Sequence, residues 1–148
     1  MLLRAFCIFL IFTSLNMLPT VANGDDSYLD KADKALSKLK SWSDLRKWFA
    51  NYPGYDDGYY AEGVSEFVTA KLAKEWNTLK YLNAEVSKNP DFEESVLMHV
   101  DATAAEQKLI KIVENAKNKC PAELRSLCRK IEKNAEMAVD DIQKSIKQ

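Results

Sequence analysis

Histidine, glycine and proline are scarce in this chain of 148 residues, which contains one histidine, four glycines and four prolines. His99 is the only histidine, so any histidine-dependent catalysis would have to use it. It falls near the C-terminal end of a predicted helix, where the helix dipole favours a protonated imidazole, and this explains it without a function. The sequence also lacks G-x-S-x-G, phosphate-loop and H-E-x-x-H motifs. We therefore assign no catalytic residue and predict no cofactor.

An excess of charge of one sign is also missing, because the formal net charge is only −1. Such a balance produces no long-range field that would attract nucleic acid or an anionic membrane. Metal ligands are few as well, since the two cysteines beyond the N-terminal apolar run and one distant histidine do not complete a zinc site. The acidic loop near residue 56 lacks the alternating spacing of a calcium loop. We predict neither a bound metal nor a nucleic-acid partner.

Long apolar runs are absent except at the N-terminus, where the charged start Met1–Arg4 precedes the apolar run Ala5–Leu18. Small and polar residues follow, and this order is typical of a secretory signal peptide. The run is shorter than the roughly 20 residues that span a bilayer. We predict a signal peptide over residues 1–22, cleaved after Ala22, with Gly24 as the second choice. The protein would then be periplasmic or secreted, without stable membrane insertion; the alternative is an uncleaved N-terminal anchor.

Beyond the signal peptide, the chain contains only two cysteines, Cys120 and Cys128. In an oxidising compartment, such a pair favours one disulfide bond. An unbroken helix would hold the two Cα atoms roughly 12 Å apart, which is too far for a disulfide. Pro121 cannot lie inside a helix, so a bend between the cysteines is expected. We predict the disulfide, and free thiols on a continuous helix remain the alternative.

Alternating apolar and polar residues of strand length do not occur, whereas apolar residues spaced by three and four occur throughout the chain. We predict an all-α fold, a compact array of six or seven short-to-medium helices, as a single domain over residues 23–148. Trp42, Trp48 and Trp76 fall at core positions of these helices. Helix starts are predicted from capping patterns at Ser41–Asp44, Asn89–Pro90 and Thr103–Glu106.

The segment 52–63 is the least helix-like part of the mature chain, with four tyrosines, three acidic residues and three glycines. Rigid aromatic side chains among glycines are suited to recognition. The alternative is a packed helix junction, in which Gly54 and Gly58 form turns, Asp57 caps the next helix and the tyrosines lie between helices. Under the first interpretation the binding residues would be Tyr55, Asp56, Asp57, Tyr59, Tyr60 and Glu62.

Two elements of the sequence resemble a family of small exported helical proteins of Gram-negative bacteria. They are D-D-G-x-x-A-E-G at residues 56–63 and C-P-x(6)-C at residues 120–128, and the resemblance covers roughly residues 42–135. It implies a periplasmic or secreted location. It brings no activity and no catalytic residues, because we know that family only as uncharacterised.

These observations favour a non-catalytic binding module that meets another exported protein or a cell-envelope component through the segment 52–63. An inhibitor or immunity-like role belongs to this class. The first alternative is a small hydrolase that uses Asp56, Asp57 or Glu62 as acid and base. The second is a purely structural envelope protein with no discrete site, and a secreted eukaryotic effector also remains open.

Overall fold

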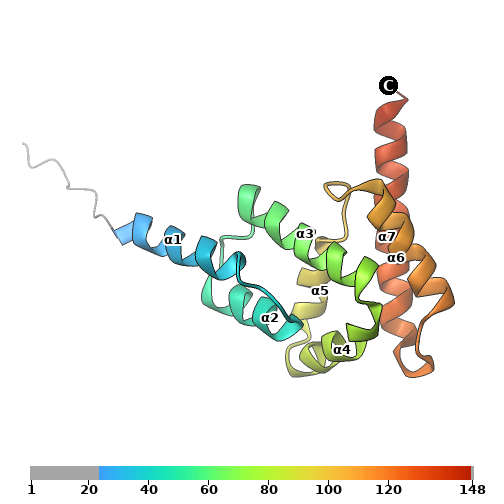
Figure 1. Cartoon of the computed structure of the whole chain (residues 1–148), viewed down its shortest axis with the longest axis horizontal. Coiled ribbons are helices and arrows are strands. Elements are labelled where there is room, and N and C mark those ends of the chain that lie inside the picture. The colour runs from blue at the N-terminus through green and yellow to red at the C-terminus, as the bar shows by residue number, and fades with distance from the viewer. Residues whose placement is uncertain (1–23, 148) are drawn as a thin grey trace, which may run out of the picture.

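The computed structural model describes residues 24–147, so the predicted signal peptide lies outside the described residues. Within this range the chain forms seven α-helices and two short 3-10 helices, without a strand (Figure 1). The prediction of an all-α array of six or seven helices is confirmed. The elements are α1 (Gly24–Leu36), α2 (Trp42–Asn51), α3 (Gly58–Lys74), η1 (Trp76–Thr78), α4 (Leu79–Lys88), α5 (Asp91–Met98), α6 (Glu106–Asn118), η2 (Ala122–Leu124) and α7 (Arg125–Ile146).

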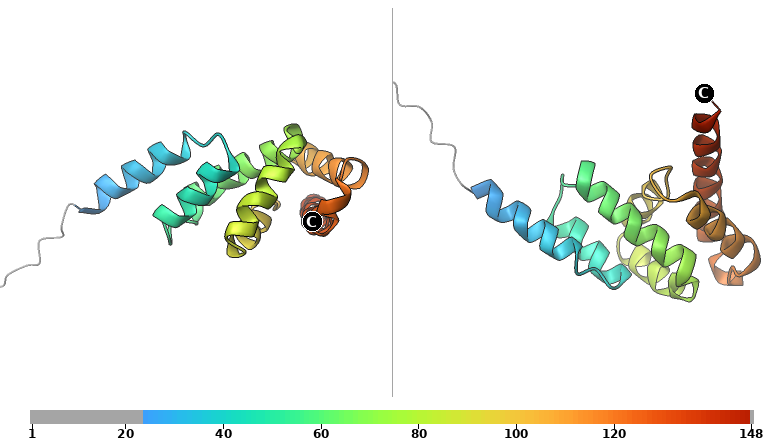
Figure 2. Two further views of the ribbon diagram at one scale, coloured as in Figure 1. Left: turned by 90° about the horizontal axis from the view of Figure 1, so that it is seen from below. Right: turned by 45° about the horizontal axis from the view of Figure 1, so that its top comes forward.

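The helices form an elongated array with α1 at one end and the α6–α7 pair at the other (Figures 1 and 2). Helices α6 and α7 run antiparallel, as shown by the contacts of Gln143 with Glu106 and of Lys117 with Glu136. Helix α3 packs against both α1 and α6, and α2 packs against α4. Helix α3 is therefore the central element, and it connects the two ends of the molecule.

Helix α2 begins with the capping box that the sequence predicts. The Ser41 hydroxyl accepts a hydrogen bond from the Asp44 backbone N–H at 3.1 Å, and the Asp44 carboxylate accepts from the Ser41 N–H at 3.0 Å. The hydrogen bond with the Ser41 side chain is the main cause that lowers the pKa of Asp44. Helix α5 begins at Asp91 after the N-cap residue Pro90, one residue later than predicted, and the Asn89 side chain accepts from the Asp91 N–H at 3.2 Å.

The capping box predicted at Thr103–Glu106 is wrong. Helix α6 begins at Glu106 after the N-cap residue Ala105, which provides no side-chain acceptor. Thr103 instead donates both its backbone N–H and its hydroxyl to the Asp101 carboxylate. The carboxylate two residues earlier competes successfully for Thr103, because an Asx turn satisfies both donors at once.

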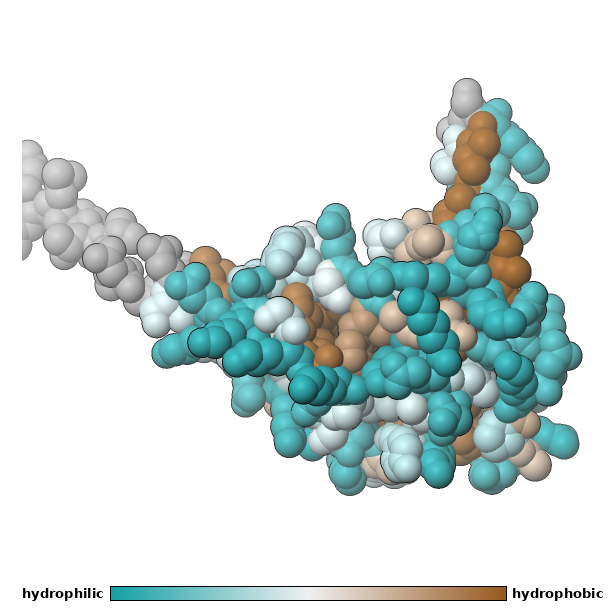
Figure 3. Space-filling view, in the orientation of Figure 1, coloured by the Kyte–Doolittle hydropathy of each residue, from teal (hydrophilic) through white to brown (hydrophobic). Residues whose placement is uncertain are grey.

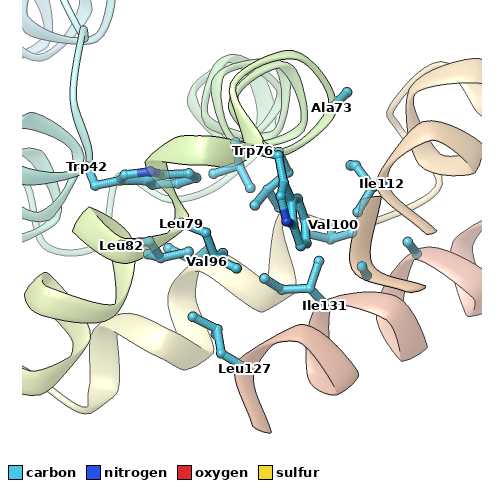
Figure 4. Packing of buried hydrophobic residues seen from close by; sticks show 14 of the residues in the cluster. Trp42, Ala73, Trp76, Leu79, Leu82, Val96, Val100, Ile112, Leu127 and Ile131 are labelled. Atoms are coloured by element: carbon cyan, nitrogen blue, oxygen red, sulfur yellow. The ribbon is translucent and has the colours of Figure 1, made fainter. Parts of the chain in front are cut away.

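The three tryptophans lie in the core, as predicted, with exposed fractions of 2%, 2% and 8% for Trp42, Trp48 and Trp76. Each indole N–H has an acceptor: the Thr78 hydroxyl, the Ala32 carbonyl and the Lys119 carbonyl, respectively. Figure 4 shows Trp76 between Val100 and Leu79, close to Ile131 of α7. The tryptophans therefore join separate elements by ring packing and by a buried or partly buried hydrogen bond.

A disulfide bond joins Cys120 and Cys128, and the predicted bend makes it possible. Helix α6 ends at Asn118, Pro121 follows in extended backbone, and α7 starts only at Arg125 after the 3-10 turn η2. This path brings the two Cα atoms to 6.1 Å. Closing a loop of this length stabilises the fold by about 2–3 kcal/mol through the entropy of the unfolded chain.

Glu85 on α4 is a buried carboxylate that connects two helices. Its side chain is 9% exposed and lies 2.6 Å from Arg46 Nε of α2 and 2.7 Å from Lys88 Nζ. The hydrogen bond from Lys88, followed by that from Arg46, holds the pKa of Glu85 below its usual value of 4.5. The ionised form is therefore the one that stabilises the junction between α2 and α4.

We expect Glu85→Gln to lower the free energy of unfolding at pH 7 by about 1–3 kcal/mol, because two charge-assisted hydrogen bonds are weakened. A lowered folded-state pKa gives stability that is complete above the unfolded pKa and is lost as the pH falls through the folded value. The difference in the free energy of unfolding between native protein and variant should therefore decrease below about pH 4.5. Urea denaturation at pH 7 and pH 3 measures it. Glu94→Gln on the exposed face of α5 is the control, and an equal Glu85→Gln gap at both pH values would contradict the prediction.

Candidate functional site

The segment between α2 and α3 makes two turns that need glycine. Gly54 has φ +84° and Gly58 has φ +46°, and both values lie in the left-handed region that side chains with a Cβ rarely adopt. A Cβ added at either position would meet no atom within 4 Å, so the backbone conformation rather than space requires glycine. The two turns fold the segment back over α1 and α3.

Three of the four tyrosines of residues 52–63 belong to an aromatic cluster. Tyr52, Tyr55 and Tyr60 are half-buried against the core. The Tyr28 ring of α1 lies 5.3 Å from the rings of both Tyr52 and Tyr55, and Trp48 lies 5.8 Å from Tyr52. These spacings are those of favourable aromatic pairs. This part of the segment is a packed helix junction.

Hydrogen bonds from the same cluster hold α1 in place. The indole N–H of Trp48 donates to the Ala32 carbonyl at 3.1 Å, and the Tyr60 hydroxyl donates to the Leu29 carbonyl at 3.2 Å. Tyr28 of α1 donates in the opposite direction, to the Asn51 carbonyl at the end of α2. Burial is the main cause that raises the pKa of Tyr60, so its phenol remains a donor. The aromatic residues thus serve first to attach α1.

Tyr59 differs from the other three because its side chain points outward and is 67% exposed. Its hydroxyl donates to Asp33 Oδ1 of α1 at 2.9 Å, and this hydrogen bond raises the pKa of the phenol. Its ring lies 5.4 Å from that of Tyr60 in an edge-to-face arrangement. An exposed ring held at both its edge and its hydroxyl is ordered before any partner arrives.

Three acidic residues lie near Tyr59, Asp33 in space and Asp57 and Glu62 along the chain. Asp57 occupies the N-cap position of α3, as predicted, but its side chain makes no capping hydrogen bond. Glu62 lies three residues after Tyr59 on the same helix, and such residues are neighbours on one face. Asp57 and Glu62 are exposed, and within the described part of the chain Asp33, Asp57 and Glu62 form no ion pair. We call Asp33, Asp57, Tyr59 and Glu62 the acidic–aromatic patch.

Asp56 turns the other way, into the molecule. Its Oδ1 lies 2.9 Å from His99 Nε2, and the His99 side chain is only 5% exposed. Both atoms are buried, and their close contact does not have the geometry of a hydrogen bond within the described residues. The opposite ring nitrogen, Nδ1, lies 3.0 Å from the Ser65 hydroxyl of α3. Ser65 in turn lies 3.3 Å from Asp101 Oδ2.

The six residues predicted for binding therefore separate into three groups. Asp57, Tyr59 and Glu62 are exposed, Tyr55 and Tyr60 are half-buried in the aromatic cluster, and Asp56 contacts His99. The sequence analysis did not identify Asp33 or Ser65. Asp33 lies 26 residues from Tyr59, and Ser65 lies 34 residues from His99. No local pattern connects them.

The surface grooves and clefts lie mainly away from residues 52–57. A shallow groove of about 720 Å³ runs between α6 and α7 and is lined by Ile110, Val113 and Met137 among charged residues. Figure 3 shows apolar surface at the C-terminal end of α7, where Ile146 is 74% exposed. A smaller cleft of about 490 Å³ lies between α3 and the 99–105 loop, and Ser65 is among the residues that line it.

The described residues contain no group of three or more histidine, cysteine, aspartate or glutamate side chains arranged to hold a metal ion. Among residues 24–147, none of the helices combines the length and apolar character required to cross a membrane. Comparison with protein-family models, curated proteins and solved structures gives no match. The function must accordingly be argued from the site itself.

Proposed function

We propose that this protein is an exported binding module that meets a positively charged segment of another exported protein through the acidic–aromatic patch. The observation that carries the proposal is the ordered, 67% exposed ring of Tyr59 among carboxylates without a cationic partner in the described chain. An arginine or lysine side chain placed over such a ring gains a cation–π contact. The carboxylates would attract the same partner over a longer range.

Export is part of the proposal and has two supports. The sequence order over residues 1–22 is that of a signal peptide. The disulfide between Cys120 and Cys128 is compatible with an oxidising compartment. A binding partner in the same compartment is then the simplest target for an exposed, pre-ordered surface.

We expect Tyr59→Ala to weaken binding of an arginine-rich peptide at least about tenfold, because exposed aromatic anchors carry a large share of binding energy. The thermal midpoint should change little, since the side chain lies mostly outside the core. Fluorescence anisotropy of a labelled peptide at low and at physiological salt measures the affinity.

Tyr81→Ala is the matched control. Tyr81 on α4 is 58% exposed, and its ring already faces Lys80 at 5.0 Å. Its loss should leave peptide binding unchanged. Equal binding by the native protein and Tyr59→Ala, or tighter binding of a glutamate-rich peptide of the same length, would refute the proposal.

A further inference from the structure

Three side chains from separate elements of the fold form a chain of polar contacts. Ser65 lies on α3, His99 ends α5, and Asp56 lies in the loop before α3. The Ser65 hydroxyl is 3.0 Å from His99 Nδ1, and Asp56 Oδ1 is 2.9 Å from His99 Nε2. The Phe49 ring lies 5.9 Å from the imidazole at an interplanar angle of 31° and helps fix its orientation.

The protons in this chain can be arranged in two ways. In the first, the Ser65 hydroxyl donates to His99 Nδ1, and the neutral imidazole carries its proton on Nε2, the nitrogen in close contact with Asp56. In the second, both ring nitrogens are protonated, Nδ1 donates to Ser65, and the hydroxyl donates to Asp101 Oδ2 at 3.3 Å. Asp56 faces Nε2 in both arrangements. The imidazole can therefore take up a proton on its Ser65 side while the ring stays in place, as a general base requires.

The cleft between α3 and the 99–105 loop gives this chain an opening to solvent. It is lined by Glu62, Ser65, Glu66, Thr103 and Ala104 and has a volume of about 490 Å³. That size is within the usual range of small-molecule sites. Ser65, which is 3% exposed, is the one member of the three that lines the cleft, so it is the part of this chain nearest to a molecule bound there. Glu66 is paired with Lys108, whereas Glu62 has no ion-pair partner among the described residues, so the uncompensated charge of Glu62 favours neutral or cationic molecules over anionic ones.

We propose that Ser65, His99 and Asp56 form an acyl-transfer centre for small neutral or cationic carboxylic esters. The Ser65 oxygen attacks the ester carbonyl carbon as His99 Nδ1 takes the hydroxyl proton. The carbon–oxygen bond to the alcohol then breaks, and His99 gives the proton to the leaving alcohol. Water attacks the acyl-Ser65 in the same way, and releases the acid and the free hydroxyl. Asp56 is a positioning residue that favours the imidazole with a proton on Nε2.

A serine-directed fluorophosphonate with a cationic tail tests the proposal. The Ser65 oxygen displaces fluoride from phosphorus as His99 takes the hydroxyl proton, so the folded native protein should carry one adduct, located on Ser65 by peptide mass spectrometry. Ser65→Ala should carry none. We expect His99→Gln to slow labelling about 100-fold or more, and Asp56→Asn about tenfold or more. An anionic probe of the same size should react more slowly.

Ser87→Ala is the control, because the Ser87 hydroxyl on α4 donates to the Asn83 carbonyl and takes no part in the site. Its labelling rate should equal that of the native protein. Asp56→Asn keeps the size of a side chain that is 25% exposed, so its thermal midpoint should stay close to native and its rate reports on the chemistry. Absence of a Ser65 adduct in the folded native protein, or equal labelling rates for native protein and Asp56→Asn, would overturn the assignment.

Discussion

Replacing Trp48 by alanine is expected to lower the free energy of unfolding by about 4 kcal/mol, within the range for buried tryptophan truncations. The side chain is 2% exposed and lies against Phe49, Tyr52 and Tyr60, with ring centroids 5.6–6.1 Å apart. Truncation leaves a cavity at the point where α1, α2 and α3 meet. It also removes the donor to the Ala32 carbonyl, and with it one of the hydrogen bonds that hold α1.

Trp48→Phe separates packing from hydrogen bonding, because it keeps an aromatic ring and removes only the indole N–H and part of the volume. A loss of about 1–2 kcal/mol is expected for this variant. Urea denaturation followed by far-ultraviolet circular dichroism measures both variants. Tyr81→Ala, an exposed aromatic truncation, should stay within about 0.5 kcal/mol of the native protein. A Trp48→Ala loss as small as that of Tyr81→Ala would contradict the packing described here.

The features predicted correctly from the sequence are those set by nearby residues. Apolar spacing of three and four identified the helices, because a helical face repeats at that interval. The Ser41–Asp44 cap formed as expected, since both partners lie within one turn. The cysteine pair was predicted together with its bend, because Pro121 rules out a continuous helix.

The features that were missed or mistaken depend on competition or on distant contacts. Thr103 had two possible partners nearby, and Asp101 satisfied both its backbone and its side chain. The Ser65–His99–Asp56 chain could not be read from spacing, because each member lies on a different element. A serine inside a helix carries no local signal that a histidine will face it.

The tyrosine-rich segment shows why composition alone leaves a site undecided. Tyrosine favours recognition surfaces and half-buried junctions for the same reason, an apolar ring with a polar end. The direction of each side chain decides between the two, and here Tyr60 faces α1 while the adjacent Tyr59 faces solvent. Adjacent helical residues point about 100° apart, so neighbours in the sequence can serve different purposes.

Replacing Asn115 is expected to have a second large effect on stability, because its buried side chain donates to backbone carbonyls at the end of α3. The residue is 1% exposed on α6, and its Nδ2 donates to the carbonyls of Leu72 and Ala73 at 3.1 and 3.0 Å. Helix α3 ends at Lys74, so these two carbonyls lie in its last turn, where intrahelical donors run out. One amide thereby satisfies two backbone acceptors and fixes α3 against α6.

We expect Asn115→Ala to lower the free energy of unfolding by about 3 kcal/mol, since it leaves two buried carbonyls unpaired and a small cavity. Asn115→Asp keeps the shape but turns an acceptor toward the same carbonyls, so at pH 7 it should cost at least as much. At acidic pH the protonated carboxyl regains one donor, so part of the stability that Asn115→Asp has lost relative to Asn115→Ala should be restored.

Urea denaturation of both variants at pH 7 and pH 4 checks this, and Asn118→Ala on the exposed end of α6 is the control. If Asn115→Ala cost no more than Asn118→Ala, packing alone would hold α3 against α6. If instead Asn115→Asp is the less stable variant at pH 7 and approaches Asn115→Ala at pH 4, the two donated hydrogen bonds are the cause. That result would show that the connection between the two ends of the molecule depends on the side-chain amide of Asn115.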